Sequence, residues 1–129
     1  MKSYGQLWET IVAKENISAG WREFRRHHVS KKSVQTFGKD LSANLERVRK
    51  RLLSGEWEPM DYQQFMVFEP KPRVISCAPV EDRVVHHAFC RVCTPLIEKR
   101  FIEQSYACRK GKGSHLAVGR ARELCREYR

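Results

Sequence analysis

Four of the chain's five prolines fall within residues 59–79, and this clustering constrains the fold more than any other feature of the sequence. Proline lacks an amide donor and clashes with the preceding helical turn, so a regular helix cannot run through the segment. Between the prolines lie two short runs rich in β-branched and aromatic residues, 64–69 and 73–77, which favour strands. Pro70-Lys71-Pro72 separates the runs. The segment is therefore predicted to form an antiparallel hairpin with a stiff, basic turn.

Helical periodicity precedes the hairpin. Residues 5–28 predict two short helical pieces, each with its own apolar stripe. A longer stripe predicts one amphipathic helix over about 33–54, with Gly55 as its C-terminal stop. The residues of this longer stripe are Val34, Phe37, Leu41, Leu45, Val48 and Leu52.

Helical periodicity returns after Pro79, and Pro95 is expected to bend or interrupt that helix. A short extended piece beginning at Ser105 then leads into a basic glycine loop. Ser114 is predicted to cap a final helix.

The predicted fold class is α+β, with amino-terminal helices, a central antiparallel hairpin and two carboxy-terminal helices. We expect a single domain over residues 1–129, consisting of a helical lead-in at 1–58 and the hairpin with its helices at 59–129. No apolar run reaches the roughly 18 residues that a bilayer requires, and no signal peptide is recognisable. A cytoplasmic protein without membrane contact is expected, and its five dispersed cysteines suit reduced thiols.

Positive charge indicates the class of partner. The chain carries 25 Lys and Arg against 15 Asp and Glu, a net charge of +10, which favours an anionic partner such as nucleic acid. A solvated basic surface without a partner is the alternative. A run of basic residues predicts a charged helical face rather than a linker; it consists of Arg22, Arg25, Arg26, His27, His28, Lys31 and Lys32.

Two basic segments are candidate anion sites. Lys71 and Arg73 flank the proposed turn, where the planar fork of arginine and the point charge of lysine could hold a triphosphate. Residues 109–115 combine cations, glycines and a helix N-terminus, whose free amides attract phosphate. The P-loop spacing is absent from this segment. A solvated turn or loop is the alternative for both.

Metal and nucleophile chemistry are less well supported. His86, Cys90 and Cys93 share a helical face, so a zinc-dependent structural protein is an alternative, although a fourth ligand must come from another element. Cysteine more often packs as a small apolar residue, and the sequence leaves metal binding here open. A cysteine nucleophile with a histidine base has no local signature in its favour.

Acidic residues are too scattered for polymerase chemistry. Two-metal nucleotidyl transfer needs clustered carboxylates to hold paired Mg²⁺ ions. Asp40, Asp61 and Asp82 stand apart from one another, and Asp82 with Glu81 suits the first turn of a helix. No complete polymerase site is predicted in this chain.

Several motifs in order resemble a known family. They are Phe-Glu-Pro-Lys-Pro-Arg-Val-Ile-Ser-Cys at 68–77, Val-Val-His-His-Ala at 84–88, Cys-Thr-Pro-Leu-Ile-Glu-Lys-Arg-Phe at 93–101 and Ser-Tyr-Ala-Cys-Arg-Lys-Gly-Lys-Gly at 105–113. Together they resemble prokaryotic reverse transcriptases, including group II intron and retron enzymes, and are most similar to the diversity-generating retroelement type. The helical lead-in at 33–60 is also similar.

The resemblance implies the fingers portion of a right-hand polymerase. It implies that Arg73, helped by Lys71, contacts the phosphates of the incoming dNTP, and that Asp82-Arg83 has a structural role. It further implies that one segment follows the template path, through Ser105, Tyr106, Arg109, Lys110 and Lys112. Partners of the full-length RNA-directed DNA polymerase would be an RNA template, a DNA primer and dNTP, with Mg²⁺ as cofactor.

The family's catalytic aspartate motifs are missing from the sequence. We therefore expect a fragment that ends before the palm, is inactive alone, and has no catalytic or metal-binding residue of its own. Surface that would meet the palm makes a homodimer of the fragment a weaker hypothesis. A stand-alone basic nucleic-acid-binding module without polymerase activity is the alternative. The retroelement type, the copying fidelity and the natural template RNA stay open.

Overall fold

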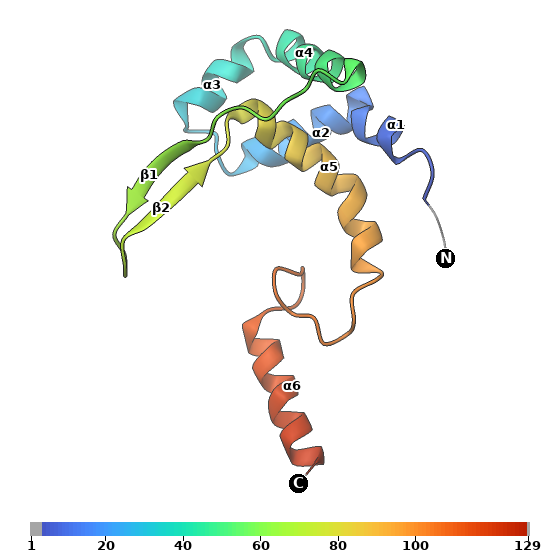
Figure 1. Cartoon of the computed structure of the whole chain (residues 1–129), viewed down its shortest axis with the longest axis vertical. Coiled ribbons are helices and arrows are strands. Elements are labelled where there is room, and N and C mark those ends of the chain that lie inside the picture. The colour runs from blue at the N-terminus through green and yellow to red at the C-terminus, as the bar shows by residue number, and fades with distance from the viewer. Residues whose placement is uncertain (1–3, 129) are drawn as a thin grey trace. The chain divides into compact units, whose positions relative to one another are not determined.

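The computed structural model of the chain describes residues 4–128, and the chain forms two compact units, 1–95 and 96–129 (Figure 1). The first unit contains α1 (Leu7–Val12), α2 (Lys14–Arg26), α3 (Lys32–Lys39), α4 (Leu41–Ser54), β1 (Gln63–Val67), β2 (Arg73–Cys77) and most of α5 (Val80–Glu98). The second contains the end of α5, a long loop and α6 (Ser114–Glu127). The predicted α+β class and its order of elements are confirmed. The expectation of one domain over 1–129 stays a prediction.

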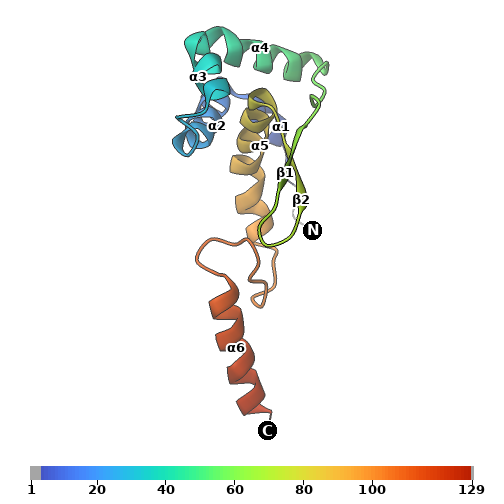
Figure 2. The ribbon, with the colours of Figure 1, turned by 90° about the vertical axis from the view of Figure 1, so that its left-hand side faces the viewer.

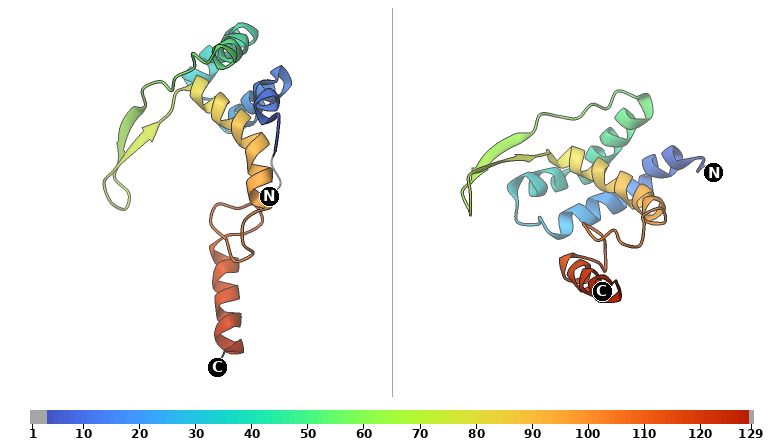
Figure 3. Two further views of the ribbon diagram at one scale, coloured as in Figure 1. Left: turned by 45° about the vertical axis from the view of Figure 1, so that its right-hand side comes forward. Right: turned by 60° about the horizontal axis from the view of Figure 1, so that its bottom comes forward.

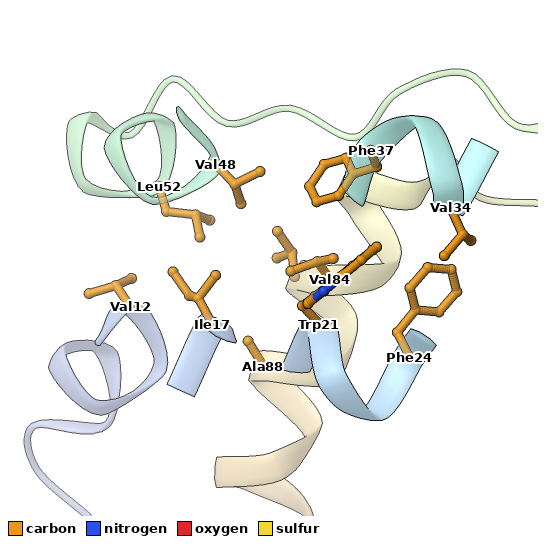
Figure 4. Packing of buried hydrophobic residues seen from close by; sticks show 11 residues of the cluster. Val12, Ile17, Trp21, Phe24, Val34, Phe37, Val48, Leu52, Val84 and Ala88 are labelled. Carbon is orange, nitrogen blue, oxygen red and sulfur yellow. The ribbon is translucent and has the colours of Figure 1, made fainter. Parts of the chain in front are cut away.

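A hydrophobic core joins the helices of the first unit (Figure 4). Trp21 and Phe24 of α2 are each 2% exposed, and the Trp21 ring centroid lies 5.0 Å from that of Phe37 in α3. Tilted aromatic contacts of this kind add to the gain from burying apolar surface. On the α5 side the core residues Val84 and Ala88 are small and completely buried. The other buried members of this core are Val12, Ile17, Val34, Val48, Leu52 and Val85.

α2 and α5 approach each other closely at Gly20. A methyl group on Gly20 would lie 2.9 Å from the backbone nitrogen of Ala88 and 3.1 Å from the carbonyl oxygen of Val84. Both are backbone atoms, so a larger residue requires a shift of α5. One turn earlier, Asn16 donates from Nδ2 to the carbonyl oxygens of Ile11 (3.0 Å) and Ala88 (2.9 Å). The Asn16 amide therefore links the end of α1 to α5 at the same crossing.

The single helix predicted over about 33–54 is wrong, because the chain breaks into α3 and α4 at Asp40 (φ −116°, ψ 48°). The two helices differ in direction (Figure 2). Asn44 stabilises the break, since its Nδ2 donates to the Phe37 carbonyl oxygen at 2.8 Å. Both helices bury their stripes against the same core, so the apolar periodicity continues across the break.

Most of the other predicted helix boundaries are confirmed. α1 and α2 are the two short pieces predicted for residues 5–28, separated at Ala13. Gly55 ends α4 with a left-handed φ of 76°, and its N–H donates to the Leu52 carbonyl oxygen at 3.3 Å. Pro95 does not interrupt α5, which continues to Glu98.

Two predictions about the second unit are wrong. Ser114 is the first residue of α6 and not its cap; the N-cap is Gly113, whose φ of 148° favours glycine. The extended piece expected from Ser105 forms no strand and turns at residues 107–108, as part of an irregular loop over 99–113. Glycines with positive φ at 111 and 113 allow this loop to turn twice before the helix begins.

The hairpin pairs β1 with β2 in an antiparallel register that runs from Gln63 opposite Cys77 to Val67 opposite Arg73. Residues 68–72 connect the strands, and every residue from 63 to 76 is exposed. Figures 1 and 3 show the hairpin projecting from the helices of the first unit. A two-stranded hairpin is marginally stable by itself. The hairpin therefore depends on its contacts with the helices to keep its position.

We predict that Gly20→Ala lowers the free energy of unfolding, by roughly 1–3 kcal/mol as in other overpacked cores, because the added methyl displaces α5. Gly38→Ala is the matched control in the same unit, since its methyl would meet the Trp21 ring at an ordinary 3.7 Å. The higher helix propensity of alanine, about 1 kcal/mol, should leave the Gly38→Ala variant as stable as the original or more so. Chemical denaturation measures both. Equal effects of the two substitutions would contradict the close approach of α2 and α5.

Candidate nucleic-acid interface

The two cations predicted to hold nucleotide phosphates lie at the tip of the hairpin. Arg73 is the first residue of β2, opposite Val67, and Lys71 lies in the turn between Pro70 and Pro72. Both residues are exposed, and within residues 4–128 neither side chain has a hydrogen bond or an ion pair. The neighbouring prolines restrict the backbone around Lys71. The turn therefore presents two unpaired positive charges on a restrained backbone.

Apolar side chains cover both faces of the same hairpin. Because side chains alternate along a strand, Phe65 and Ile75 share one face with Arg73, and Met66 and Val74 share the other. All four apolar side chains are at least 38% exposed. A sheet with one covered face usually alternates apolar and polar residues, and this hairpin does not. Both of its faces are suited to contact with further surfaces.

Asp82 fixes the segment that leads into β1. This residue in the first turn of α5 is completely buried, and its Oδ2 accepts the Met60 N–H at 2.9 Å. Its Oδ1 has no hydrogen-bond partner among the described residues. A buried oxygen without a partner opposes folding. The bond from Met60 to Oδ2 is therefore the hydrogen bond through which Asp82 stabilises this segment.

Arg83 fixes the other end of the hairpin. Its Nη1 lies 3.8 Å from Sγ of Cys77, the last residue of β2, and its guanidinium lies 4.8 Å over the Phe24 ring. Its Nη2 also lies 3.5 Å from Nε2 of His28. Since the His28 Nδ1 lies 2.8 Å from the Phe24 carbonyl oxygen, that nitrogen must carry the proton, and Nε2 can accept from Arg83. Together, Asp82 and Arg83 attach both ends of the hairpin to the helical core.

Arg109 organises the loop of the second unit. Its Nε donates to Oε2 of Glu98 at 2.8 Å, and its Nη1 donates to the carbonyl oxygens of Ile102 (3.2 Å) and Ser105 (3.1 Å). The side chain is only 13% exposed, and its guanidinium lies 5.0 Å from the Phe101 ring centroid. An arginine with several internal acceptors holds the loop in shape. A direct contact of Arg109 with the template stays a prediction.

Two lysines complete the loop. Lys112 donates to the Glu103 carbonyl oxygen, and its Nζ lies 5.1 Å from the Tyr106 ring centroid, a cation–π contact. Lys110 is exposed and has no ion pair with any residue that the structure describes. The residues predicted to contact the template thus lie together in one loop of the second unit: Ser105, Tyr106, Arg109, Lys110 and Lys112. Lys71 and Arg73 belong to the first unit.

The cations of α6 differ in their pairing. Arg120 donates to Glu123 at 3.0 Å and lies 3.6 Å from Glu127. The hydrogen bond to Glu123 raises the pKa of the Arg120 guanidinium above its ordinary value. Arg122 and Arg126 on the same helix are exposed and have no ion pair with another described residue. These two arginines are therefore suitable control positions for charge substitutions.

No arrangement for metal binding was found in the described part of the chain. His86 and Cys90 are exposed along α5, and Cys93 is half-buried. Within residues 4–128, no group of three or more His, Cys, Asp or Glu side chains could hold a metal ion. The described residues therefore do not fit a zinc site, nor a site for the Mg²⁺ ions of a polymerase.

Comparison with models of known protein families gave no match, and comparison with curated proteins gave none either. Between residues 4 and 128, no helix has the length and apolar character needed to cross a membrane.

We predict that Asp82→Ala lowers the free energy of unfolding by roughly 1–3 kcal/mol, because the Met60 N–H loses its acceptor. Asp82→Asn keeps an oxygen at the same position and should retain most of the stability. Hydrogen exchange at the Met60 amide is the local measurement, and exchange should accelerate in the alanine variant alone. If the asparagine variant is equally destabilised, the carboxylate does not act mainly as an acceptor for Met60.

Arg109→Ala should loosen the loop, because the carbonyl groups of Ile102 and Ser105 lose their donor. Amide hydrogen exchange across residues 99–113 is expected to accelerate by about tenfold, the equivalent of one net hydrogen bond of about 1.4 kcal/mol. Lys110→Ala removes an exposed cation from the same loop and should leave the exchange unchanged. Similar exchange in all three proteins would show that Arg109 does not hold the loop.

Proposed function

We propose that this chain is the fingers-side part of a prokaryotic reverse transcriptase and contributes phosphate contacts to an RNA-directed DNA polymerase. The observation that carries the proposal is the projecting hairpin, which presents Lys71 and Arg73 without internal partners. It supports the expectation, drawn from the motifs at 68–77 and 105–113, that these two cations contact dNTP.

The chemistry of the turn suits a triphosphate. The guanidinium of Arg73 can donate two parallel hydrogen bonds to one phosphate group, and Lys71 adds a mobile point charge. Neither cation is neutralised by a neighbouring acid in the part of the chain that the structure describes. Arg73 begins a paired strand, so its position is set by the register of the hairpin. A free cation on a defined scaffold is what positioning of a substrate requires.

The loop of the second unit would serve the RNA template in this proposal. Arg109 sets the shape of the loop through its bonds to Glu98 and to two carbonyl groups. Lys110 supplies an exposed charge, and Tyr106 and Lys112 supply a ring and a cation side by side. Aromatic rings and cations are the groups that bind single-stranded nucleic acid. In this proposal Arg109 holds the shape of the loop, and Tyr106, Lys110 and Lys112 contact the template.

Catalysis would require carboxylates from outside the described residues. Of the three aspartates, Asp82 is buried and bonded to Met60, and Asp40 ends α3. In this proposal the Mg²⁺ ligands belong to polypeptide other than residues 4–128, in a cytoplasmic enzyme that uses a DNA primer. Self-association through the exposed hairpin faces, giving a homodimer of this chain, is a secondary part of the proposal.

A stand-alone nucleic-acid-binding module is the second candidate, because the unpaired cations do not require a polymerase. The adjoining coding sequence discriminates between the two. A catalytic aspartate motif followed by Tyr-x-Asp-Asp in the same reading frame supports the reverse transcriptase, and a reading frame without them supports the module.

We predict that Arg73→Ala, introduced into the polymerase that contains this chain, raises the apparent KM for dNTP by about ten- to a hundredfold, the range for loss of a charged hydrogen bond. Arg122→Ala is the control, since it removes an exposed arginine of α6. Steady-state kinetics with varied dNTP measures the effect. An apparent KM that Arg73→Ala leaves unchanged would remove the phosphate contact from the proposal.

A further inference from the structure

The corner formed by α2, the following turn and α3 carries a strong excess of positive charge. Residues 22–39 contain six Lys or Arg and a single acid, Glu23. That acid is already engaged, because Arg91 of α5 donates to it and His87 lies 3.8 Å away. Asp40, the next acid along the chain, forms no ion pair with a described residue. The six cations are Arg22, Arg25, Arg26, Lys31, Lys32 and Lys39, and none has an ion pair with another described residue.

These cations stand on an ordered scaffold. The turn between α2 and α3 is closed by backbone bonds from the His28 N–H to the Arg25 carbonyl oxygen (2.9 Å) and from the Lys31 N–H to the His28 carbonyl oxygen (3.1 Å). Beneath it, Phe24 and Val34 are each 2% exposed and anchor both helices in the core. The charges therefore form a fixed surface and not a mobile tail.

The geometry of the surface suits a row of phosphates. Arg22 and Arg26 are exposed and one helical turn apart, about 6 Å along the axis. On one strand of a duplex each phosphate advances about 3.4 Å along the axis, so phosphates two steps apart are separated by a similar distance, roughly 7 Å. A hollow of about 380 Å³ between α2 and α3 is lined by two further cations, Arg25 and Lys39, with Gln35 as another polar group.

Within residues 22–39, the same surface has no exposed Phe, Tyr or Trp ring on which the bases of single-stranded nucleic acid could stack. Proteins that bind single strands stack the bases on exposed aromatic rings. The Trp and Phe rings of α2 and α3 are instead buried in the core: Trp21 and Phe24 are 2% exposed and Phe37 is 8% exposed. The surface therefore consists mainly of cations, which suit the sugar-phosphate backbone that a duplex presents on its outside.

We propose that this α2–α3 cationic surface binds the phosphate backbone of a nucleic-acid duplex, as a site separate from the hairpin and from the loop at 99–113. The inference does not rest on the reverse-transcriptase proposal, because it requires no dNTP, primer or catalytic group. Its contacts are electrostatic and independent of base sequence.

The test is binding of the full chain to labelled duplex RNA, duplex DNA and single-stranded RNA over a series of salt concentrations. Arg22→Gln, Arg25→Gln and Arg26→Gln are combined in one variant. Lys50→Gln, Arg122→Gln and Arg126→Gln are combined in the control, which loses the same net charge from exposed helical positions without ion pairs among the described residues. Circular dichroism verifies that both variants are folded.

The α2 variant should bind duplexes about tenfold or more weakly, and the slope of log K against log salt should become shallower by about 2 to 3, as for three lost phosphate contacts. The control should retain the original slope and affinity within a few-fold. Equal losses in both variants would show a general effect of net charge and overturn the proposal. So would unchanged duplex binding, absence of duplex binding by the original chain, a preference for single strands, or equally strong displacement by polyglutamate.

Variants of the hairpin separate this inference from the proposed function. Lys71→Ala with Arg73→Ala should leave duplex binding unchanged, even if it alters the use of dNTP. Loss of duplex binding in that hairpin variant, with full binding retained by the α2 variant, would move the duplex contact to the hairpin and overturn the inference.

Discussion

The contact on which the first unit depends is the crossing of α2 and α5 at Gly20, where a side chain as small as a methyl group would press on backbone atoms of α5. Asn16 strengthens the crossing through its bonds to the end of α1 and to the middle of α5. α5 also carries Asp82 and Arg83, which attach the hairpin. A displacement at Gly20 would therefore reach the hairpin through a chain of direct contacts. The position of Arg73 therefore depends on the packing of α5 against α2.

The cations of this protein fall into two physical groups. Arg47 and Arg51 share Glu81, while Arg109 is enclosed by Glu98 and carbonyl groups, so these side chains maintain structure. The second group has no ion pair with a described residue and includes Lys71, Arg73, Lys110 and the α2–α3 cationic surface, as well as the control positions Lys50, Arg122 and Arg126. Because the donors of a structural cation are already bonded to acceptors and a carboxylate offsets its charge, it has less to offer a ligand than an exposed, unpaired one. Ion pairing therefore shows which charges are engaged in the structure, and the clustering of the unpaired ones indicates where several could meet phosphates together.

Sequence reasoning was most successful where local chemistry decides the structure. Prolines delimited the hairpin, and Gly55 ended α4, because both residue types act on their own backbone. The break at Asp40 was not predictable from periodicity, since α3 and α4 face one core and Asn44 acts through a bond seven residues away. The shaping role of Arg109 was missed for a related reason, because Glu98 lies eleven positions upstream and the bond exists only after the loop folds. Sequence motifs identify candidate cations. Burial and ion pairing in the structure then distinguish the cations that hold the fold from those that are available to a ligand.

The exposed hairpin has a consequence for colloidal behaviour. Each strand has one outer edge with unpaired backbone groups, next to apolar side chains such as Phe65 and Met66, and such an edge is a template for growth of a sheet between molecules. The net charge of +10 opposes that growth through repulsion between molecules. Salt screens the repulsion between molecules, but it does not remove the exposed edges of the strands. The cationic character of the chain thus also protects it from aggregation.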